Sequence, residues 1–159
     1  MKVGRVTLSD RASAGVYEDL SGPEIERVFC GCWDGECSFV ARLLPDDRAS
    51  IAATLRELCD VEDCPLVITT GGTGPAPRDV TPEATREVIE KELPGFGEAM
   101  RMQSFVSVPT AILSRATAGV RGRSLILNLP GNPRSIEQCL PSLIPAIREA
   151  LHHLREKSQ

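Results

Sequence analysis

Short hydrophobic runs along this chain indicate β-strands. Residues 65–70 are apolar toward both faces and rich in β-branched side chains, as expected for a central strand of a parallel sheet. The stretches 110–113 and 116–120 have a weaker extended pattern. We therefore predict strands over residues 3–9, 38–44, 65–70, 110–113, 116–120 and 124–128.

Between these runs, apolar side chains recur with the spacing of helices. Ile25, Val28 and Phe29 lie on one helical face, and Ser21 has the spacing of a capping box with Glu24. Helices are predicted to begin near residue 21, to pass through 51–59, to run from Thr81 to about 93, to cover about 97–104 and to run from 136 to 154.

Polar residues and prolines indicate where some of these helices begin or break. Asp46 or Asp47 can cap the helix through 51–59, and Thr81 can cap the next one. Pro141 and Pro145 are expected to split the last helix into two pieces, because each proline removes a helical hydrogen bond. Residues 10–15 are expected to form a polar loop.

Strands that alternate with helices through short connections indicate an α/β fold. Such a chain forms right-handed crossovers and a mostly parallel central sheet with helices on both faces, which makes three layers. No internal repeat or low-complexity linker interrupts the 159 residues, so we predict a single domain over residues 1–159. Ligands of open sheets of this kind bind beyond the carboxyl ends of the strands.

Charge and composition narrow the class of partner. The net charge of −4 argues against nucleic acid or an anionic membrane surface as a partner. No apolar run approaches the roughly 18 residues of a membrane-spanning helix, and the first residues enter a strand pattern rather than a signal-peptide pattern. We therefore expect a cytoplasmic protein. Its six cysteines are interpreted as reduced thiols, because their spacing does not match a zinc site.

A glycine-rich loop follows the strand predicted over 65–70. Gly71, Gly72 and Gly74 permit positive φ angles and a close approach of the main chain to a ligand, so that successive N–H groups can bind an anion. The loop lacks the lysine of a Walker loop and the glycine spacing of a dinucleotide fingerprint. A tight structural turn is the alternative interpretation.

Two aspartates favour the ligand-binding interpretation. Asp79 follows the loop closely, and a carboxylate beside bound phosphate requires a cation between the two charges. Mg²⁺ fits, because it binds one or two carboxylates together with phosphate oxygens. Asp46 is the natural second carboxylate, with a helix cap as its alternative role. Arg78 can balance phosphate charge or be merely solvated, and Gly131-Asn132 can form a phosphate seat or an ordinary cap.

Several segments together resemble one known family. The run from Thr69 to Thr85, which contains the glycine loop, closely resembles the signature of the MogA-type molybdopterin adenylyltransferases. This MogA/MoaB family includes the G domain of gephyrin. Collinear similarity extends to residues 9–19, 44–47, 94–98, 111–115 and 127–131.

The resemblance implies a three-layer α/β homotrimer that transfers AMP from Mg-ATP to molybdopterin and releases pyrophosphate. ATP and molybdopterin would be its substrates, Mg²⁺ its cofactor, and the molybdate-insertion enzyme of the same pathway a further partner. By position, Asp46 and Asp79 match the family's two essential aspartates, as catalytic residues and metal ligands. The implied nucleotide-binding residues are Thr70, Gly71, Gly72, Thr73, Gly74 and Arg78. The implied pterin-binding residues are Ser9, Asp10, Ser114, Asn128, Pro130 and Gly131.

Other functions stay open at this level. A MoaB-like paralogue would bind pterin or nucleotide with little adenylylation, although the Ser9-Asp10-Arg11 start and the two aspartates favour the active branch. A trimeric binding or scaffold module and a molybdate-insertion enzyme are further alternatives; long linkers, partner motifs and a molybdate site are not apparent in the sequence. No stripe of exposed apolar residues identifies an oligomer interface.

Overall fold

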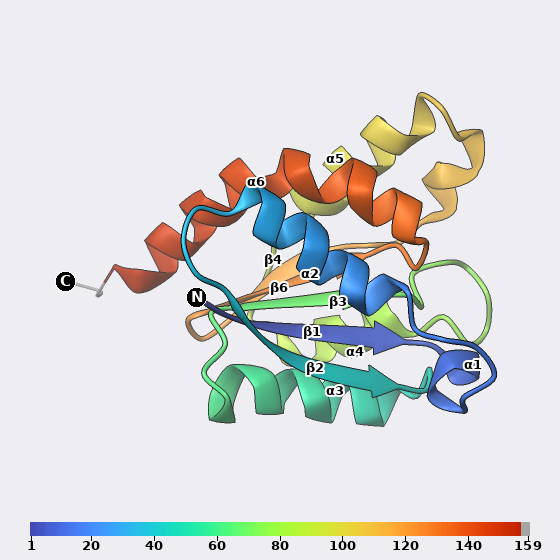
Figure 1. The fold of residues 1–159 in the computed structure, drawn as a ribbon, viewed down its shortest axis with the longest axis horizontal. Helices are drawn as coiled ribbons and strands as arrows, with labels where there is room; N and C mark the ends of the chain where they lie inside the picture. The colour runs from blue at the N-terminus through green and yellow to red at the C-terminus, as the bar shows by residue number, and fades with distance from the viewer. Residues whose placement is uncertain (157–159) are drawn as a thin grey trace.

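A computed structural model describes residues 1–156 and confirms the three-layer α/β arrangement (Figure 1). A six-stranded sheet with the order β2-β1-β3-β6-β5-β4 lies between two layers of helices. The last three residues of the domain predicted over 1–159 lie outside the described residues. The strands are β1 (Lys2–Leu8), β2 (Ser38–Leu44), β3 (Leu66–Thr70), β4 (Lys91–Glu92), β5 (Ala118–Arg121) and β6 (Ser124–Leu129).

Three helices cover one face of the sheet, and two cover the other. In Figure 1, α2, α5 and α6 lie above the sheet, and α3 and α4 lie below it. A π-helical turn, η1 (Glu57–Val61), extends α3, and a 3-10 helix, η2 (Pro109–Leu113), follows α5. The α-helices are α1 (Asp10–Ser13), α2 (Ser21–Cys32), α3 (Arg48–Arg56), α4 (Thr81–Val88), α5 (Gly95–Phe105) and α6 (Pro133–Arg155).

The four strands β2, β1, β3 and β6 are parallel and end at the same edge of the sheet. Leu8 of β1 lies beside Leu44 of β2, and Thr70 of β3 lies beside Leu129 of β6. The loops that leave these strands therefore emerge next to one another, on the right in Figure 1. β4 and β5 add an antiparallel border on the side of β6.

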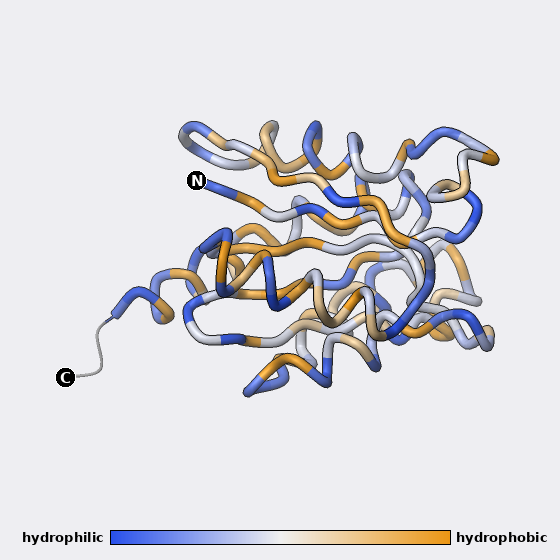
Figure 2. The backbone as a smooth tube through the Cα atoms, turned by 90° about the horizontal axis from the view of Figure 1, so that it is seen from below, coloured by the Kyte–Doolittle hydropathy of each residue, from blue (hydrophilic) through white to orange (hydrophobic). Residues whose placement is uncertain are grey.

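Alternate residues of the central strands are buried toward opposite helical layers. In β6, Leu125 and Leu127 pack with α2, α5 and α6, whereas Ile126 packs with α3 and α4. Figure 2 shows hydrophobic stretches along the central strands and more hydrophilic ones in the loops. Because both faces of these strands are covered, their sequences are hydrophobic throughout.

The stretch 110–113 is a 3-10 helix, so the strand predicted there is wrong. Its turns close through hydrogen bonds from Ala111 N to Val108 O (3.0 Å) and from Ser114 N to Ala111 O (3.1 Å). The apolar side chains of Ile112 and Leu113 are exposed. Their hydrophobicity therefore does not report burial in a sheet.

The last helix runs unbroken past its two prolines, contrary to the predicted split. Pro141 and Pro145 lie four residues apart on the exposed side of α6. The carbonyls of Glu137 and Pro141, which lose their helical partners, belong to exposed residues as well. Packing of the opposite apolar face, from Ile136 to Leu151, holds the helix together.

Several helix boundaries also differ from the prediction. The polar loop expected over 10–15 begins with the one-turn helix α1, which Ser9 caps by accepting a hydrogen bond from Ala12 N (3.1 Å). Ser21 does not cap α2; Asp19 accepts the hydrogen bond from Gly22 N (3.0 Å) in its place. The helix predicted to reach residue 93 ends at Val88, and β4 follows.

Exposed apolar side chains gather over the end of α5 and over η2, which corrects the expectation that no such stripe exists. Val106 is 87% exposed, the largest value among the exposed large apolar side chains. We call this group the α5–η2 apolar patch; it consists of Met102, Phe105, Val106, Val108, Ile112 and Leu113. Among residues 1–156, no helix combines the length and the hydrophobicity that a membrane crossing requires.

Candidate active site

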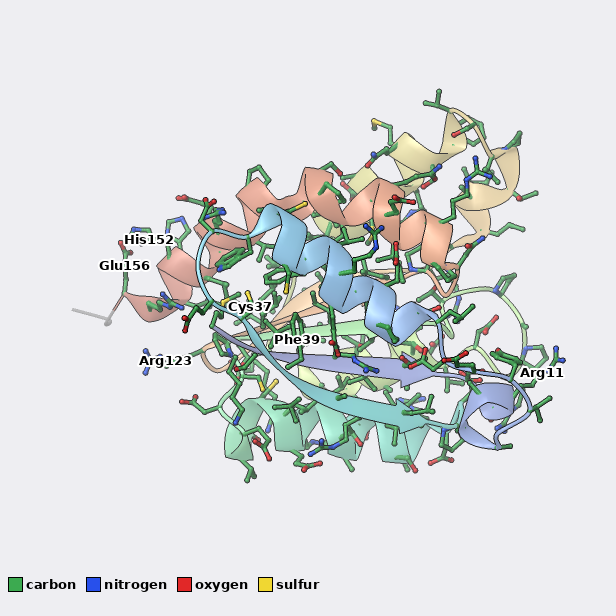
Figure 3. The ribbon with its side chains drawn as sticks, in the orientation of Figure 1. Arg11, Cys37, Phe39, Arg123, His152 and Glu156 are labelled. Atoms are coloured by element: carbon green, nitrogen blue, oxygen red, sulfur yellow. The ribbon has the colours of Figure 1, made fainter. Side chains whose placement is uncertain are left out.

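A cavity of about 400 Å³ opens at the carboxyl edge of the parallel strands. It is lined by the loops that follow β1, β2, β3 and β6, and by the first residues of α2. In Figure 3, Arg11 of α1 lies at this end of the molecule and Arg123 at the opposite end. The loops predicted to lie at one edge of the sheet thus surround one space.

The glycine loop begins with a turn that only glycine fits. Gly71 has a φ of +97°, and a Cβ atom there would lie 2.3 Å from the carbonyl oxygen of Leu8. Thr70 Oγ1 donates a hydrogen bond to Pro130 O (2.7 Å), which joins the ends of β3 and β6. Thr70 and Gly71, on one side of this contact, both line the cavity.

Thr81 holds the turn against α4. Its hydroxyl donates to Gly71 O (2.9 Å) and its N–H donates to Gly72 O (3.1 Å). It is the first residue of α4 rather than its cap, because its side chain is used by the loop. Within residues 1–156, the N–H groups of Gly72, Thr73 and Gly74 have no protein acceptor. Successive free N–H groups of this kind can bind an anion, and Gly72 lines the main cavity.

Asp46 is not a helix cap, because Asp47 takes that role by accepting a hydrogen bond from Ser50 N (2.9 Å). Asp46 and Asp10 exchange two hydrogen bonds: Asp10 N donates to Asp46 Oδ2 (3.1 Å), and Asp46 N donates to Asp10 Oδ1 (2.9 Å). Among residues 1–156, Asp46 Oδ1 is buried without a hydrogen-bond partner. Burial, followed by the charges of Asp10 and Asp79, raises the pKa of this carboxyl above its ordinary value.

Arg78 makes a two-pronged ion pair with Asp10. Its Nε lies 2.9 Å from Asp10 Oδ2, and its Nη2 lies 2.8 Å from Asp10 Oδ1. These hydrogen bonds hold the pKa of Asp10 below its usual range. Asp10, which the resemblance assigned to the pterin, therefore lies in the network that joins the glycine loop to Asp46.

Asp79 faces the same cavity as Asp46. Its Oδ2 accepts a hydrogen bond from Ala76 N (3.0 Å) and lies 2.8 Å from where a Cβ on Gly74 would stand. A Cβ on Gly72 would likewise lie 3.0 Å from Asp46 Oδ1. The two carboxylates thus flank opposite ends of the glycine turn, in a cavity that both line.

This donor set fits Mg²⁺. Oxygen ligands suit the ion, and the orphaned Oδ1 of Asp46 is a buried acceptor that a cation would satisfy. Within the described residues no group of three or more His, Cys, Asp or Glu side chains forms a metal cage. Mg²⁺ does not need one, because it usually keeps water and takes substrate phosphate oxygens as ligands.

The predicted pterin residues divide between two cavities and the core. Gly131 and Ser9 line the main cavity, whereas Pro130 and Ser114 line a neighbouring one of about 190 Å³. Asn128 is fully buried, and its amide donates to the hydroxyls of Thr69 (3.1 Å) and Thr85 (2.9 Å). These hydrogen bonds place Asn128 in the packing of β3 and β6 against α4, and it lines neither cavity.

Several cavity residues were not singled out from the sequence, among them Tyr17 and Asp19. Tyr17 places its hydroxyl 2.9 Å from Ser9 Oγ, and Asp19 accepts from Thr7 Oγ1 (2.8 Å) and from Arg5 (3.3 Å). Both lie within the segment 9–19 whose resemblance was recognised. The polar side chains of that segment, which follows a strand, were the signal that could have identified them as cavity residues.

The family model described as a probable molybdopterin binding domain matches residues 4–149. The chain belongs to this family. It is 54% identical to a molybdopterin adenylyltransferase of Helicobacter pylori over 91% of this chain and 82% of the relative. It is 48% identical to the molybdopterin adenylyltransferase of Escherichia coli K12, over 96% of this chain and 78% of the relative. The crystal structure of the molybdopterin biosynthesis enzyme MoaB from Thermus thermophilus superimposes with a TM-score of 0.88 at 43% identity, over 98% of this chain and 97% of the other.

Proposed function

We propose that this family member is a molybdopterin adenylyltransferase, which transfers AMP from ATP to the terminal phosphate of molybdopterin and releases pyrophosphate. The observation that carries the proposal is the pair of aspartates on either side of a glycine turn with free N–H groups. The identity of 48% and 54% to relatives named for this activity supports the same reaction.

Asp46 and Asp79 would hold Mg²⁺ between them and the phosphates of the nucleotide. When bound, Mg²⁺ would neutralise charge on the α-phosphate and on the departing pyrophosphate. The free N–H groups of residues 72–74 would bind phosphate oxygens without a side chain in the way. Arg78, which pairs with Asp10 and so with the network that reaches Asp46, would supply a positive charge to the same oxygens.

The pterin would occupy the neighbouring cavity beside Ser114. Pro130 lines that cavity and Gly131 lines the main one, so two adjacent residues of one loop adjoin both spaces. A molybdopterin phosphate that passes over this loop would reach the nucleotide. Ser9, on the main cavity, would contact the joined phosphates.

Positioning, rather than proton abstraction, would supply most of the rate. The terminal phosphate of molybdopterin is already an anion at neutral pH and needs no strong base. The barrier lies in bringing two polyanions together and stabilising the charge that develops on transfer. Asp46 and Asp79 therefore act as ligands in this proposal, and neither acts as a general base.

We also propose that the chain acts as a homotrimer in the cytoplasm and hands its product to the enzyme that inserts molybdate. The exposed α5–η2 apolar patch supports assembly with further copies. The six free thiols fit a reducing compartment. Adenylyl-molybdopterin is an activated intermediate, so an enzyme that consumes it must follow.

Replacing one metal ligand tests the reaction. We expect Asp79→Asn to lower the rate of pyrophosphate release from molybdopterin and Mg-ATP by at least about 100-fold, since it removes a charged ligand without changing shape. Asp47→Asn is the matched control, because Asp47 caps α3 outside the cavity and asparagine is also a good capping residue; any loss of stability should leave turnover unchanged. Near-normal turnover of Asp79→Asn would remove it from the mechanism.

A binding protein with little catalysis is the second candidate, favoured by the close superposition on MoaB. The same assay separates the two functions. A wild-type chain that binds molybdopterin and Mg-ATP but releases no pyrophosphate would overturn the adenylyltransferase proposal and support this second one.

A further inference from the structure

Arg115 lies behind the glycine loop, in the segment between η2 and β5, and donates to that loop from several of its nitrogen atoms. Its main-chain N–H donates to Thr73 O (2.7 Å) and its Nε to Gly74 O (2.9 Å). Its Nη2 donates to Asp79 O (2.8 Å). One residue therefore joins both ends of the segment that carries the glycines and the second aspartate.

The segment has few hydrogen bonds of its own. Asp79 N donates to Ala76 O (3.0 Å), and Ala76 N donates to Asp79 Oδ2 (3.0 Å). These bonds close the tip of the loop, but they do not fix the tip relative to the sheet. Arg78 ties the tip to α1 through Asp10, and the contacts of Arg115 with Gly74 and Asp79 tie it to the segment before β5.

The remaining donor of Arg115 connects the loop to a helix. Its Nη1 pairs with the carboxylate of Glu83, in the first turn of α4. The two side chains are 34% and 33% exposed, so water screens the pair only in part. α4 is also the helix whose Thr81 pins Gly71 and Gly72. Arg115 thus completes a frame around the loop on the side away from the cavity.

Arg115 does not line the main cavity; it lines a separate hollow with Arg86, Glu92 and Arg101. Its charge is neutralised by Glu83, and its donors are occupied by main-chain carbonyls. It would therefore influence phosphate transfer through the position of Asp79 and of the residue 72–74 amides rather than by touching the substrate.

We propose that Arg115 is a positioning residue for adenylyl transfer, which sets the main chain of Gly74 and Asp79 so that metal and nucleotide bind in register. This inference rests on the proposed function. It also predicts that lysine cannot replace the arginine, because only a planar fork can reach the Gly74 carbonyl, the Asp79 carbonyl and Glu83 at once.

Steady-state kinetics of Arg115→Lys test the inference. We expect kcat/KM for Mg-ATP to fall by about 100-fold, the scale of a misplacement near 1 Å. The Mg²⁺ concentration for half-maximal rate should rise, while KM for molybdopterin stays within about twofold, because Ser114 and Pro130 keep their cavity. A residue with only a structural role would lower the melting temperature without this selective effect on Mg-ATP.

Arg121→Lys is the matched control. Arg121 also divides its fork between a carboxylate, Asp60, and a main-chain carbonyl, that of Val88. It lies at the start of the turn that contains Arg123, which is at the far end of the molecule from Arg11 in Figure 3. The control should change stability and leave both KM values unchanged.

Hydrogen exchange of the full chain supplies a readout that does not depend on activity. In Arg115→Lys, the amides of Ala76 and Asp79 should exchange faster than in the wild type, and in Arg121→Lys they should not. Unchanged exchange, or faster exchange with normal kinetics for Mg-ATP, would overturn the positioning role. A wild-type chain that releases no pyrophosphate would overturn the proposed function alone, since the exchange result would still stand.

Discussion

At the scale of single residues, burial of the ionised Asp46 carboxylate lowers the stability of the fold. Among residues 1–156 its Oδ1 atom is buried without a partner, and α1 and the glycine loop bring the carboxylates of Asp10 and Asp79 near it. Burial and like charges both disfavour the ionised form. Residues that lower stability in this way are often kept for function, here to bind a cation.

Asp46→Asn should therefore make the free protein more stable at neutral pH while abolishing most of its activity. The pKa of Asp46 is raised on folding, so the folded state binds the proton more tightly than the unfolded state. Between the ordinary pKa of 3.8 and the raised value, the contribution of Asp46 to the free energy of unfolding falls as pH rises. Thermal unfolding of both proteins from pH 3 to 7, without Mg²⁺, measures the difference.

The advantage of the asparagine variant should grow as pH rises through that window and then level off. Asp47→Asn should behave in the opposite way, because hydrogen bonds from Ser50 lower the pKa of Asp47 in the folded state. Its folded-state carboxylate stabilises the protein above the unfolded pKa, and this contribution is lost as pH falls through the folded pKa. A neutral-pH melting temperature below that of the wild type for Asp46→Asn would show that its charge is already compensated without metal.

The sequence motifs were enough to propose candidate site residues, but they did not predict the hydrogen-bond partners of those residues. Asp46, Asp79 and the glycines came from strand-end positions and from resemblance. The pairing of Arg78 with Asp10 depends on the glycine loop meeting α1, which no local pattern encodes. The partners of Asn128 were not predictable either: β6 is covered on both faces, so a polar residue there can face a ligand or another buried hydroxyl, and Asn128 bonds to two hydroxyls.

At the scale of elements, the turn after β3 is the place where the fold requires one residue type, glycine. A Cβ at residue 71 would lie 2.3 Å from Leu8 O, in a backbone conformation with φ of +97°. We expect Gly71→Ala to lower the free energy of unfolding by about 3 kcal/mol or more, from strain and the clash together, and to reduce nucleotide binding. Urea unfolding measures the first effect.

Gly122→Ala measures the cost of the backbone strain alone, without the steric clash that Gly71→Ala adds. Gly122 also has a positive φ, +54°, but a Cβ there would meet nothing within 4 Å. The left-handed conformation alone should cost about 1–2 kcal/mol. If the two variants lose equal stability, the contact between Gly71 and the end of β1 does not constrain the turn.

Helices and strands were predicted correctly where the hydrophobic periodicity reflects burial. The predictions failed where apolar residues are exposed or where packing overrides a local signal. The buried strands β1, β3 and β6 and the amphipathic helix α2 follow their hydrophobic patterns. η2 was misread because its apolar residues face outward, and α6 because packing outweighs the hydrogen bonds its prolines remove. α1 is a single turn and too short to have a period.

At the scale of the whole molecule, alternation of strands and helices was enough to predict three layers and a site at the carboxyl edge. The parallel ladder from β2 to β6 places four loops side by side, so the cavity follows from topology. The antiparallel border of β5 and β4 was not predictable in the same way. Those strands are short, and their pairing depends on the turn at residues 122–123.

The α5–η2 apolar patch gives the last prediction, on assembly. We expect the wild type to run as a trimer in light scattering at micromolar concentration, because several exposed apolar side chains on one excursion of the chain favour burial against another copy. Val106→Glu should shift the population to monomers, since it would bury an unpaired charge in the interface. Val61→Glu is the matched control: Val61 is 77% exposed but lies on η1, outside the patch. A monomeric wild type would contradict the prediction, and so would equal dissociation by both substitutions, because a specific interface must distinguish residue 106 from residue 61.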